Sequence, residues 1–386
     1  MDELATAAGM YSEKLGKDYR IFLYTGLYYP GHPPYRIFRW DYKVESSRDK
    51  TDFFTALTKV EDENYAVFFH HDTWQNLPYF KSLFPEAEMD YFAHEAWGKQ
   101  FDILKISNEN IKQIRGLDAE FRGSGFNDKS SNSLPVITGE ENRRMPYTAI
   151  WKGRLFCPYY GRYSFRNRHN TAFEIRINGK LIQGNKEVIL AKGFHNIEVR
   201  SEIKSPADKL SLYMNASRYT GARRAHYANI DLNERYLYNI PRTGLHASYY
   251  VSDVWDESVV LEEEIIPLAS SRRIYQHAPT SRLSGRVLIR EGGEYKFYIY
   301  SHGYTAVVIN NRAYFDTNNM PAARESLPVS GLKRVSVFKL SKGEHKIDIY
   351  TYKSARMYLK WGVNGRGETD IPFDVLIPED RVVFVE

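Results

Sequence analysis

The sequence predicts a multidomain protein in which a small α/β sheet domain is followed by two antiparallel β-sandwiches. Its 386 residues exceed the size of one ordinary domain. The aromatic share of 15%, with 30 Tyr and 21 Phe, favours strands. A third observation is that one segment recurs later in the chain. The expected domains are residues 1–107, 116–230 and 244–386.

Composition excludes several classes of function. The net charge is only +5 and no basic run stands out, so nucleic acid is not an expected partner. Cys157 is the only cysteine, which excludes an intrachain disulfide and a Cys-rich metal site. No stretch reaches about 18 apolar residues, so nothing is expected to span a membrane. The first 18 residues lack the features of a signal peptide and predict an amphipathic helix that begins abruptly.

Residues 1–107 alternate helical and strand patterns, which indicates a small parallel or mixed sheet. Nearly continuous apolar runs are typical of strands that are buried on both faces. The polar segment 107–116 is interpreted as a linker. The expected strands are 19–26, 65–72, 87–93 and 101–106, and the expected helices are 51–59 and the stretch 73–85.

A pocket is one of two interpretations of this first region, because ligands bind beyond the carboxyl ends of strands in open α/β sheets. His32 follows the first strand, and His70, His71 and Asp72 end the second, so they could converge as a polar pocket or metal site. The alternative is that the adjacent histidines point to opposite faces and that Asp72 caps the next helix. No phosphate-binding loop and no nucleophile elbow is present.

From residue 116 onward, short segments that alternate in period two are separated by Gly, Asn, Asp and Pro, which is typical of sandwiches or barrels. Examples are 173–177, 195–199, 294–300 and 345–350.

Residues 151–180 align without a gap to residues 283–312. The identical pairs are Gly153/Gly285, Arg154/Arg286, Gly161/Gly293, Tyr163/Tyr295, Phe165/Phe297, Ile177/Ile309 and Asn178/Asn310. The match continues on both sides, at 116–121 with 244–249 and at 189–199 with 339–349. The common order indicates a duplicated domain.

Each repeated feature has a structural interpretation. Gly161 and Gly293 open a strand after a turn. The Tyr-x-Phe pairs place two aromatic rings on one face of a strand, toward the core. The Asn178-Gly179 and Asn310-Asn311 pairs predict tight hairpin turns. His195 and His345 occupy equivalent places and are interpreted as part of the scaffold.

This ordered set resembles the protective-antigen fourteen-kilodalton domain, a lectin-like β-sandwich of toxins, adhesins, glycosidases and glycosyltransferases. The family pattern matches Gly116–Phe121, Trp151–Leu155, Gly161–Phe165, Ile177–Lys180 and Gly193–Ile197. The second copy has Leu283 in place of the Trp and Asn311 in place of the Gly. The resemblance covers roughly two thirds of the chain.

The resemblance implies a calcium site made by two adjacent aspartates in carbohydrate-binding members, because calcium needs hard oxygen ligands. The corresponding loops here contain Arg168-His169-Asn170 and Ser301-His302-Gly303. Neither has the aspartate pair, so calcium is not expected and no other cofactor is implied. A sugar would stack its apolar face on aromatic rings and form a few hydrogen bonds with polar side chains. The candidate residues are Trp151, Tyr159, Tyr160, His169 and Asn170, with a structural position in the core or at its rim as the favoured alternative for Trp151.

The first region resembles the soluble tail of bacterial membrane glycosyltransferases of the protein-mannosyltransferase-like superfamily. That resemblance rests on the pattern of residues 1–106, and it implies a non-catalytic, extracytoplasmic (periplasmic) portion of a membrane enzyme. The membrane portion of the same polypeptide and a glycan or glycolipid would then be its partners.

The leading hypothesis is such a portion, which positions or recognises glycan. The alternative is a free-standing carbohydrate-binding or adhesion protein. A third hypothesis is a glycosidase, which needs two carboxylates flanking the scissile bond. No motif nominates that pair.

Overall fold

The computed structural model is mostly β, with several antiparallel sheets and few helices. None of the helices in the described part of the chain has the length and apolar character needed to cross a membrane. The chain forms two compact units: Met1–Gly116 with Asn233–Ile240, and Leu117–Leu232 with Pro241–Glu386. The structure describes residues 11, 14–15, 18–24, 44–46, 53–59, 62–70, 76–94, 98–138, 143–183, 186–218, 225–252, 255, 260–266, 270–271, 278–301, 304–314, 332–352 and 357–385.

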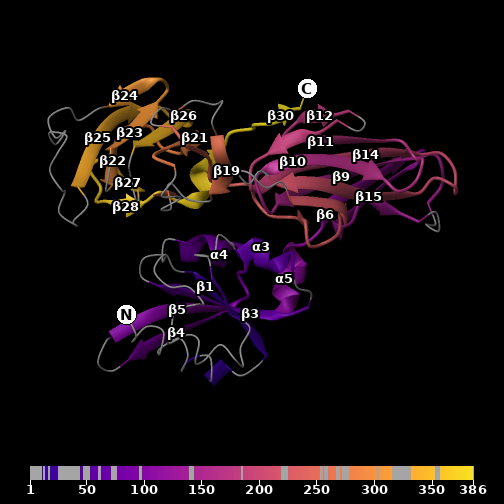
Figure 1. The fold of residues 1–386 in the computed structure, drawn as a ribbon, viewed down its shortest axis with the longest axis horizontal. Coiled ribbons are helices and arrows are strands. Elements are labelled where there is room, and N and C mark those ends of the chain that lie inside the picture. Colours follow the sequence, from indigo (N-terminus) through magenta and orange to yellow (C-terminus); the bar gives the residue numbers. More distant parts are fainter. Residues whose placement is uncertain are drawn as a thin grey trace. The chain divides into compact units, whose positions relative to one another are not determined.

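The first unit contains a mixed sheet with the strand order β2-β1-β3-β5-β4 (Figure 1, indigo to purple). Strand β1 is parallel to β2 and β3, whereas β5 is antiparallel to β3 and β4. The four strands predicted in this region are confirmed within the described residues, which exclude positions 25–26 and 71–72 of the predicted ranges, and β2 was not predicted. Their bounds are β1 Tyr19–Tyr24, β2 Val44–Ser46, β3 Asn64–His70, β4 Glu88–His94 and β5 Gly98–Ile106.

Strands β1 and β3 are buried on both faces, as their apolar runs predict. Phe22 packs edge-to-face on Phe53 of helix α3, at 5.7 Å between ring centroids. Phe68 makes a similar contact with Tyr11, at 5.7 Å. The two predicted helical stretches are helices α3 Phe53–Leu57 and α4 Leu77–Leu83.

The segment expected to be a linker contains a helix, α5 (Asn108–Ile114). Ser107 forms a capping box with Asn110, because each side chain accepts a hydrogen bond from the other residue's backbone N–H. Ile111 and Ile114 are buried, so the polar composition hid a helix with one apolar face.

Residues 233–240, which lie between the two sandwiches in the sequence, belong to the first unit. They contain the short strand β17 (Leu237–Tyr238). The Gly116 N–H donates to the Leu237 carbonyl at 2.8 Å, and the Asn239 N–H donates to the Ile114 carbonyl at 2.8 Å.

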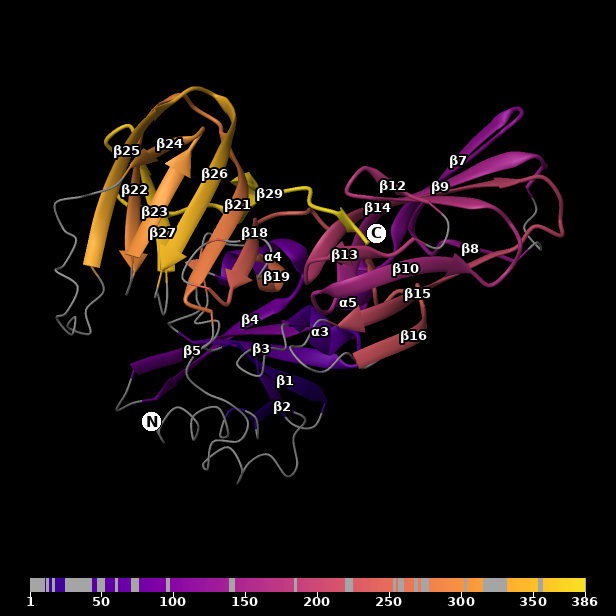
Figure 2. The ribbon, with the colours of Figure 1, turned by 45° about the horizontal axis from the view of Figure 1, so that its top comes forward.

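The first sandwich is built of two antiparallel sheets (Figures 1 and 2). One has the order β12-β11-β14-β9-β6-β7, with β6 Leu117–Gly123, β7 Phe126–Ser133, β9 Tyr147–Cys157, β11 Phe173–Ile177, β12 Lys180–Ile182 and β14 Gly193–Ile203. The other has the order β16-β15-β10-β13-β30, with β8 on β15: β8 Val136–Ile137, β10 Gly161–Asn167, β13 Val188–Leu190, β15 Leu210–Arg218, β16 Ala225–Asp231 and β30 Val383–Phe384.

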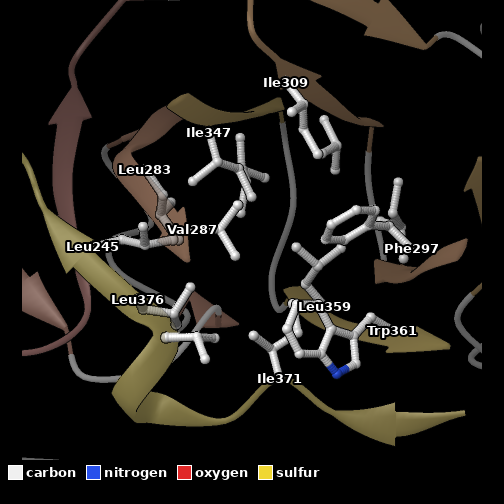
Figure 3. Packing of buried hydrophobic residues seen from close by; sticks show 14 of the residues in the cluster. Leu245, Leu283, Val287, Phe297, Ile309, Ile347, Leu359, Trp361, Ile371 and Leu376 are labelled. Atoms are coloured by element: carbon white, nitrogen blue, oxygen red, sulfur yellow. The ribbon is translucent and has the colours of Figure 1, made fainter. Parts of the chain in front are cut away.

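The second sandwich repeats this plan and encloses one apolar core that both sheets share (Figure 3). The sheet β19-β18-β21-β26-β23-β24, with β29 on β21, consists of β18 Leu245–Tyr250, β19 Val260–Ile266, β21 Thr280–Ile289, β23 Tyr304–Ile309, β24 Arg312–Tyr314, β26 Gly343–Tyr352 and β29 Leu376–Pro378. The sheet β20-β27-β22-β25, with β28 on β27, consists of β20 Ser270–Ser271, β22 Gly293–Ser301, β25 Leu332–Leu340, β27 Met357–Val363 and β28 Thr369–Asp370. A short 3-10 helix, Phe373–Val375, precedes β29.

The predicted hairpins are confirmed in both copies. Asn178 (φ 50°) and Gly179 (φ 79°) connect β11 to β12, and Asn310 (φ 49°) and Asn311 (φ 63°) connect β23 to β24. Positive φ at both central residues is the geometry of a type I′ turn, which asparagine and glycine adopt most readily.

Each hairpin asparagine also holds the repeated histidine. The Asn178 amide nitrogen lies 3.1 Å from His195 Nδ1, and His195 Nε2 lies 2.8 Å from the Ala191 carbonyl. This arrangement suits a neutral imidazole that donates through Nε2 and accepts at Nδ1. Both histidines are buried, and His345 makes the same two contacts with Asn310 and Ser341 at 2.7 Å each, which confirms the scaffold interpretation.

The last residues connect the two sandwiches. After β29 pairs with β21 of the second sandwich, β30 pairs with β13 of the first, through Val188↔Phe384 and Ile189↔Val383 (β30 is labelled in Figure 1, β29 and β13 in Figure 2).

Candidate functional site

Trp151 is fully buried in the core of the first sandwich. Its ring packs edge-to-face on Phe121, with the centroids 5.8 Å apart, and its indole N–H donates to the Ser133 hydroxyl at 3.3 Å. The equivalent residue of the second copy, Leu283, is also fully buried. Trp151 therefore offers no ring face to a ligand and occupies the alternative, core position.

Tyr159 and Tyr160 lie in the turn between β9 and β10, where both are half-buried. The Tyr159 ring is stacked on Tyr163 at 6.0 Å, and the Tyr163 hydroxyl donates to the Tyr159 carbonyl at 2.7 Å. The second copy repeats the hydroxyl contact, from Tyr295 to the Glu291 carbonyl at 2.7 Å. This turn is thus part of the repeated scaffold.

His169 and Asn170 are exposed in the loop between β10 and β11, at the other end of β10. The seven residues of that strand, at about 3.3 Å each, separate the two groups by about 20 Å. The structure therefore does not bring Tyr159 and Tyr160 together with His169 and Asn170.

Asn167 fixes the loop that carries His169. Its amide nitrogen donates to the Thr171 carbonyl at 2.9 Å and to the Lys209 carbonyl at 3.3 Å. Its amide oxygen accepts from the backbone N–H groups of His169 at 3.2 Å and Ser211 at 2.9 Å. One asparagine thus ties the β10–β11 loop to the chain that enters β15, and it preorganises the exposed residues between them.

Arg168 borders the same loop. Its guanidinium is paired with Asp231, at 2.5 Å from Nη2 to Oδ1, and lies 5.3 Å from the centroid of the Tyr213 ring. The pair is exposed, so it adds little stability. Its effect is to place a planar cation and a carboxylate beside His169.

The turn between β14 and β15 completes this end. The Asp208 carboxylate accepts from the backbone N–H groups of Lys204 at 2.8 Å and Ser205 at 2.9 Å, which lowers the Asp208 pKa below its ordinary value. The Lys209 N–H donates to the Thr171 hydroxyl at 2.9 Å. We call Arg168–Thr171, Asp208, Lys209, Tyr213 and Asp231 the loop end of the first sandwich.

The second copy lacks the same clamp. The residue equivalent to Asn167 is Ile299, which is buried in the core. His302 and Gly303 lie outside the described residues. The loop end is therefore a feature of the first copy alone among the residues that the structure describes.

Metal ligation finds no support in the described ranges, where no group of three or more His, Cys, Asp or Glu side chains could hold an ion. At the loop end, Asp208 accepts two backbone N–H groups and Asp231 is paired with Arg168. The loop itself contributes no carboxylate.

The pocket expected in the first unit can be followed only in part. Strands β1 and β3 are parallel neighbours, and Tyr24 pairs with Phe69, so their carboxyl ends meet at one sheet edge. His70 ends β3 at that edge. His32, His71 and Asp72 lie outside the described residues.

The sequence reasoning missed a buried polar cluster between the two sandwiches of the second unit. Glu263 Oε1 lies 2.9 Å from Arg381 Nη1, 3.3 Å from His246 Nε2 and 3.1 Å from the Ser248 hydroxyl. Burial alone would raise the Glu263 pKa, but the contacts with His246, Arg381 and Ser248 outweigh it and lower the pKa. The backbone of Lys192, in the first sandwich, is hydrogen-bonded to strand β19 of the second, because the Lys192 N–H donates to the Glu263 carbonyl at 2.8 Å.

Arg242 also makes contacts between the two sandwiches. It donates to the Phe194 carbonyl at 3.2 Å and the Glu379 carbonyl at 3.0 Å, and it is paired with Asp380. Two signals in the sequence pointed here: His246 stands where the first copy has the exposed Asp118, and Glu263 lies in the acidic run 262–264. That run suggests a solvated turn or strand end, but Glu263 is buried.

No protein-family model matches the chain. No curated protein matches it either.

Among solved structures, an anti-sigma factor domain-containing protein from Clostridium clariflavum is 15% identical with a TM-score of 0.28, over 69% of this chain and 100% of that one. A β-glucosidase from Kluyveromyces marxianus in complex with glucose is 16% identical with a TM-score of 0.26, over 34% of this chain and 16% of that one. The epithelial adhesin 6 A domain from Candida glabrata in complex with Galb1-3GlcNAc is 12% identical with a TM-score of 0.25, over 37% and 89%. At these scores the likenesses assign neither a family nor a ligand to this chain.

Proposed function

We propose that this chain is a non-catalytic glycan-recognition module and that the loop end of the first sandwich is its binding surface. The observation that carries the proposal is the Asn167 clamp, which holds an exposed His169 and Asn170 beside the Arg168–Asp231 pair and the Tyr213 ring. Preorganised polar groups next to an aromatic ring suit a sugar, which has both hydroxyl groups and an apolar face.

A glycan array followed by calorimetry tests this proposal. We expect the double substitution His169→Ala, Asn170→Ala to abolish binding of the glycan found on the array, with the melting temperature unchanged because both side chains are exposed. Tyr160→Ala, at the opposite end of β10, is the matched control and should bind normally. Loss of binding in Tyr160→Ala alone would instead place the site at the β9–β10 turn, and an array without any signal would remove the proposal.

The wider context is also a proposal. The chain would be the extracytoplasmic portion of a membrane glycosyltransferase, in which the first unit is a small α/β domain. The support is the order of a mixed sheet with short helices followed by duplicated sandwiches, together with the resemblance of residues 1–106. Sequencing the gene upstream of the codon for Met1 tests it. A reading frame without membrane-spanning segments there would favour the free-standing carbohydrate-binding alternative.

A further inference from the structure

The two copies keep an identical Gly-Arg pair at the same place in the fold. Arg154 of β9 lies opposite Asn196 of β14, and Arg286 of β21 lies opposite Lys346 of β26. Both arginines are on the outer faces of their sheets, because Leu155 and Val287 beside them point into the cores.

The second copy supplies a counterion and the first does not. Arg286 Nη1 lies 2.7 Å from Glu344 Oε2. The residue equivalent to Glu344 is Phe194, which is buried against the ring of Phe156, 5.0 Å away. The duplicated arginine has thus lost its carboxylate in the first sandwich.

Arg154 is poorly satisfied among the described residues. Its Nη1 donates to the neighbouring Gly153 carbonyl at 3.0 Å, while its Nε is buried without an acceptor. No carboxylate in the described part of the chain pairs with it. A buried guanidinium nitrogen without an acceptor destabilises the folded protein, because it has lost its hydrogen bonds to water and has gained none in the protein.

A second cation increases the positive potential here. Burial lowers the Arg154 pKa, and the charge of Arg242 lowers it further. Arg242 donates to the Phe194 and Glu379 carbonyls and has Asp380 as its counterion, whereas no carboxylate among the described residues is paired with Arg154.

We propose that Arg154 is the centre of an oxyanion-binding site, which takes a carboxylate or phosphate group as the counterion that Glu344 supplies to Arg286 in the second copy. The planar fork of a guanidinium matches both groups in a bidentate geometry. An anion there would give Nε an acceptor and Arg154 a counterion. This site lies away from the loop end of the first sandwich and does not depend on the proposed glycan function.

Thermal-shift and calorimetric titrations of the full chain test the site at constant ionic strength, with sodium phosphate, sodium acetate and sodium glucuronate against sodium chloride. We expect at least one oxyanion to raise the melting temperature, and Arg154→Gln to weaken its binding at least tenfold. The phosphate and carboxylate arms distinguish the two ligand chemistries. Methyl glucoside, which lacks the charge, should have no effect at this site.

Two further variants make the result decisive. Arg286→Gln, the substitution of the paired duplicate, should leave oxyanion binding unchanged. Phe194→Glu restores the missing carboxylate and should remove the oxyanion effect while Arg154 is still present. An oxyanion response that persists in Arg154→Gln, or the absence of any response in the wild-type chain, would overturn the proposal.

Discussion

The two sandwiches share their hairpin turns and differ at particular core and loop positions. Both keep the asparagine hairpin, the buried histidine beneath it and the Tyr-x-Phe pair. Among the many equivalent positions that differ, four change the local chemistry or packing: Asp118/His246, Asn167/Ile299, Phe194/Glu344 and Trp151/Leu283. The two copies thus keep the residues at which backbone geometry leaves little choice, whereas side chains differ both in the cores, as at Trp151/Leu283, and at the loops.

The largest effect is expected at the core position that differs between the copies. Trp151→Ala should lower the free energy of unfolding of the first sandwich by about 3 to 5 kcal/mol, because it leaves a large cavity. Leu283→Ala should cost about 2 to 5 kcal/mol in the second. Hydrogen exchange of β9 and β14, compared with β21 and β26, separates the two losses.

A stable Trp151→Ala variant with weakened glycan binding would contradict the core assignment. The Leu283→Ala variant is its control, since it changes the same position of the other copy.

The buried histidine of the first copy should make that sandwich sensitive to acid. Burial lowers the His195 pKa from 6.5 to about 3. The unfolded chain therefore takes up the proton first, so the stability present above pH 6.5 is lost as the pH falls toward 3, at up to about 1.4 kcal/mol per pH unit.

Urea unfolding between pH 6.5 and 5 measures how the free energy of unfolding changes with pH. This range lies above the ordinary pKa of a glutamate such as Glu263, so protonation of that carboxylate contributes little. We expect the wild type to lose about 2 kcal/mol over that interval and His195→Gln to lose less. His169→Gln, an exposed loop substitution, is the matched control. Equal slopes in all three proteins would show that His195 is not the sensor.

The smallest effect compares the two hairpins. Asn178→Ala and Asn310→Ala should each cost about 1 to 2 kcal/mol, because alanine at positive φ is strained and the contact with the histidine is lost. Asn178→Gly and Asn310→Gly keep the turn geometry and isolate the side-chain part. Chemical denaturation of the four variants measures both. A loss confined to one copy would mean that the matching contacts do not have matching energies.

The local features of the sandwiches could be predicted from the sequence. The Asn-Gly turn at 178–179 and the Tyr163-x-Phe165 pair depend on neighbouring residues only, so a short segment specifies them. The helix α5 was missed because its capping box and two apolar residues were hidden by polar neighbours. The burial of Trp151 remained one of two alternatives, since a single sequence does not show which face of β9 is covered.

The candidate sites depended on tertiary structure and were harder to predict. Tyr160 and Asn170 are ten positions apart in sequence, but the strand between them places them at opposite ends of a sheet. The clamp by Asn167 needs the backbone of residues 209 and 211, at the start of β15, which is far away in sequence but adjacent to β10 in the sheet. The inter-sandwich cluster combines residues 246, 263 and 381, and no local pattern links them.

The crossing of the last strand also affects how the protein is made. Strand β13 of the first sandwich pairs with Val383 and Phe384, which are synthesised nearly two hundred residues after it. Domains generally fold as units from the N-terminus during synthesis. The first sandwich cannot complete its sheet in this way, so its edge at β13 stays open on the ribosome until translation of the whole second sandwich has finished.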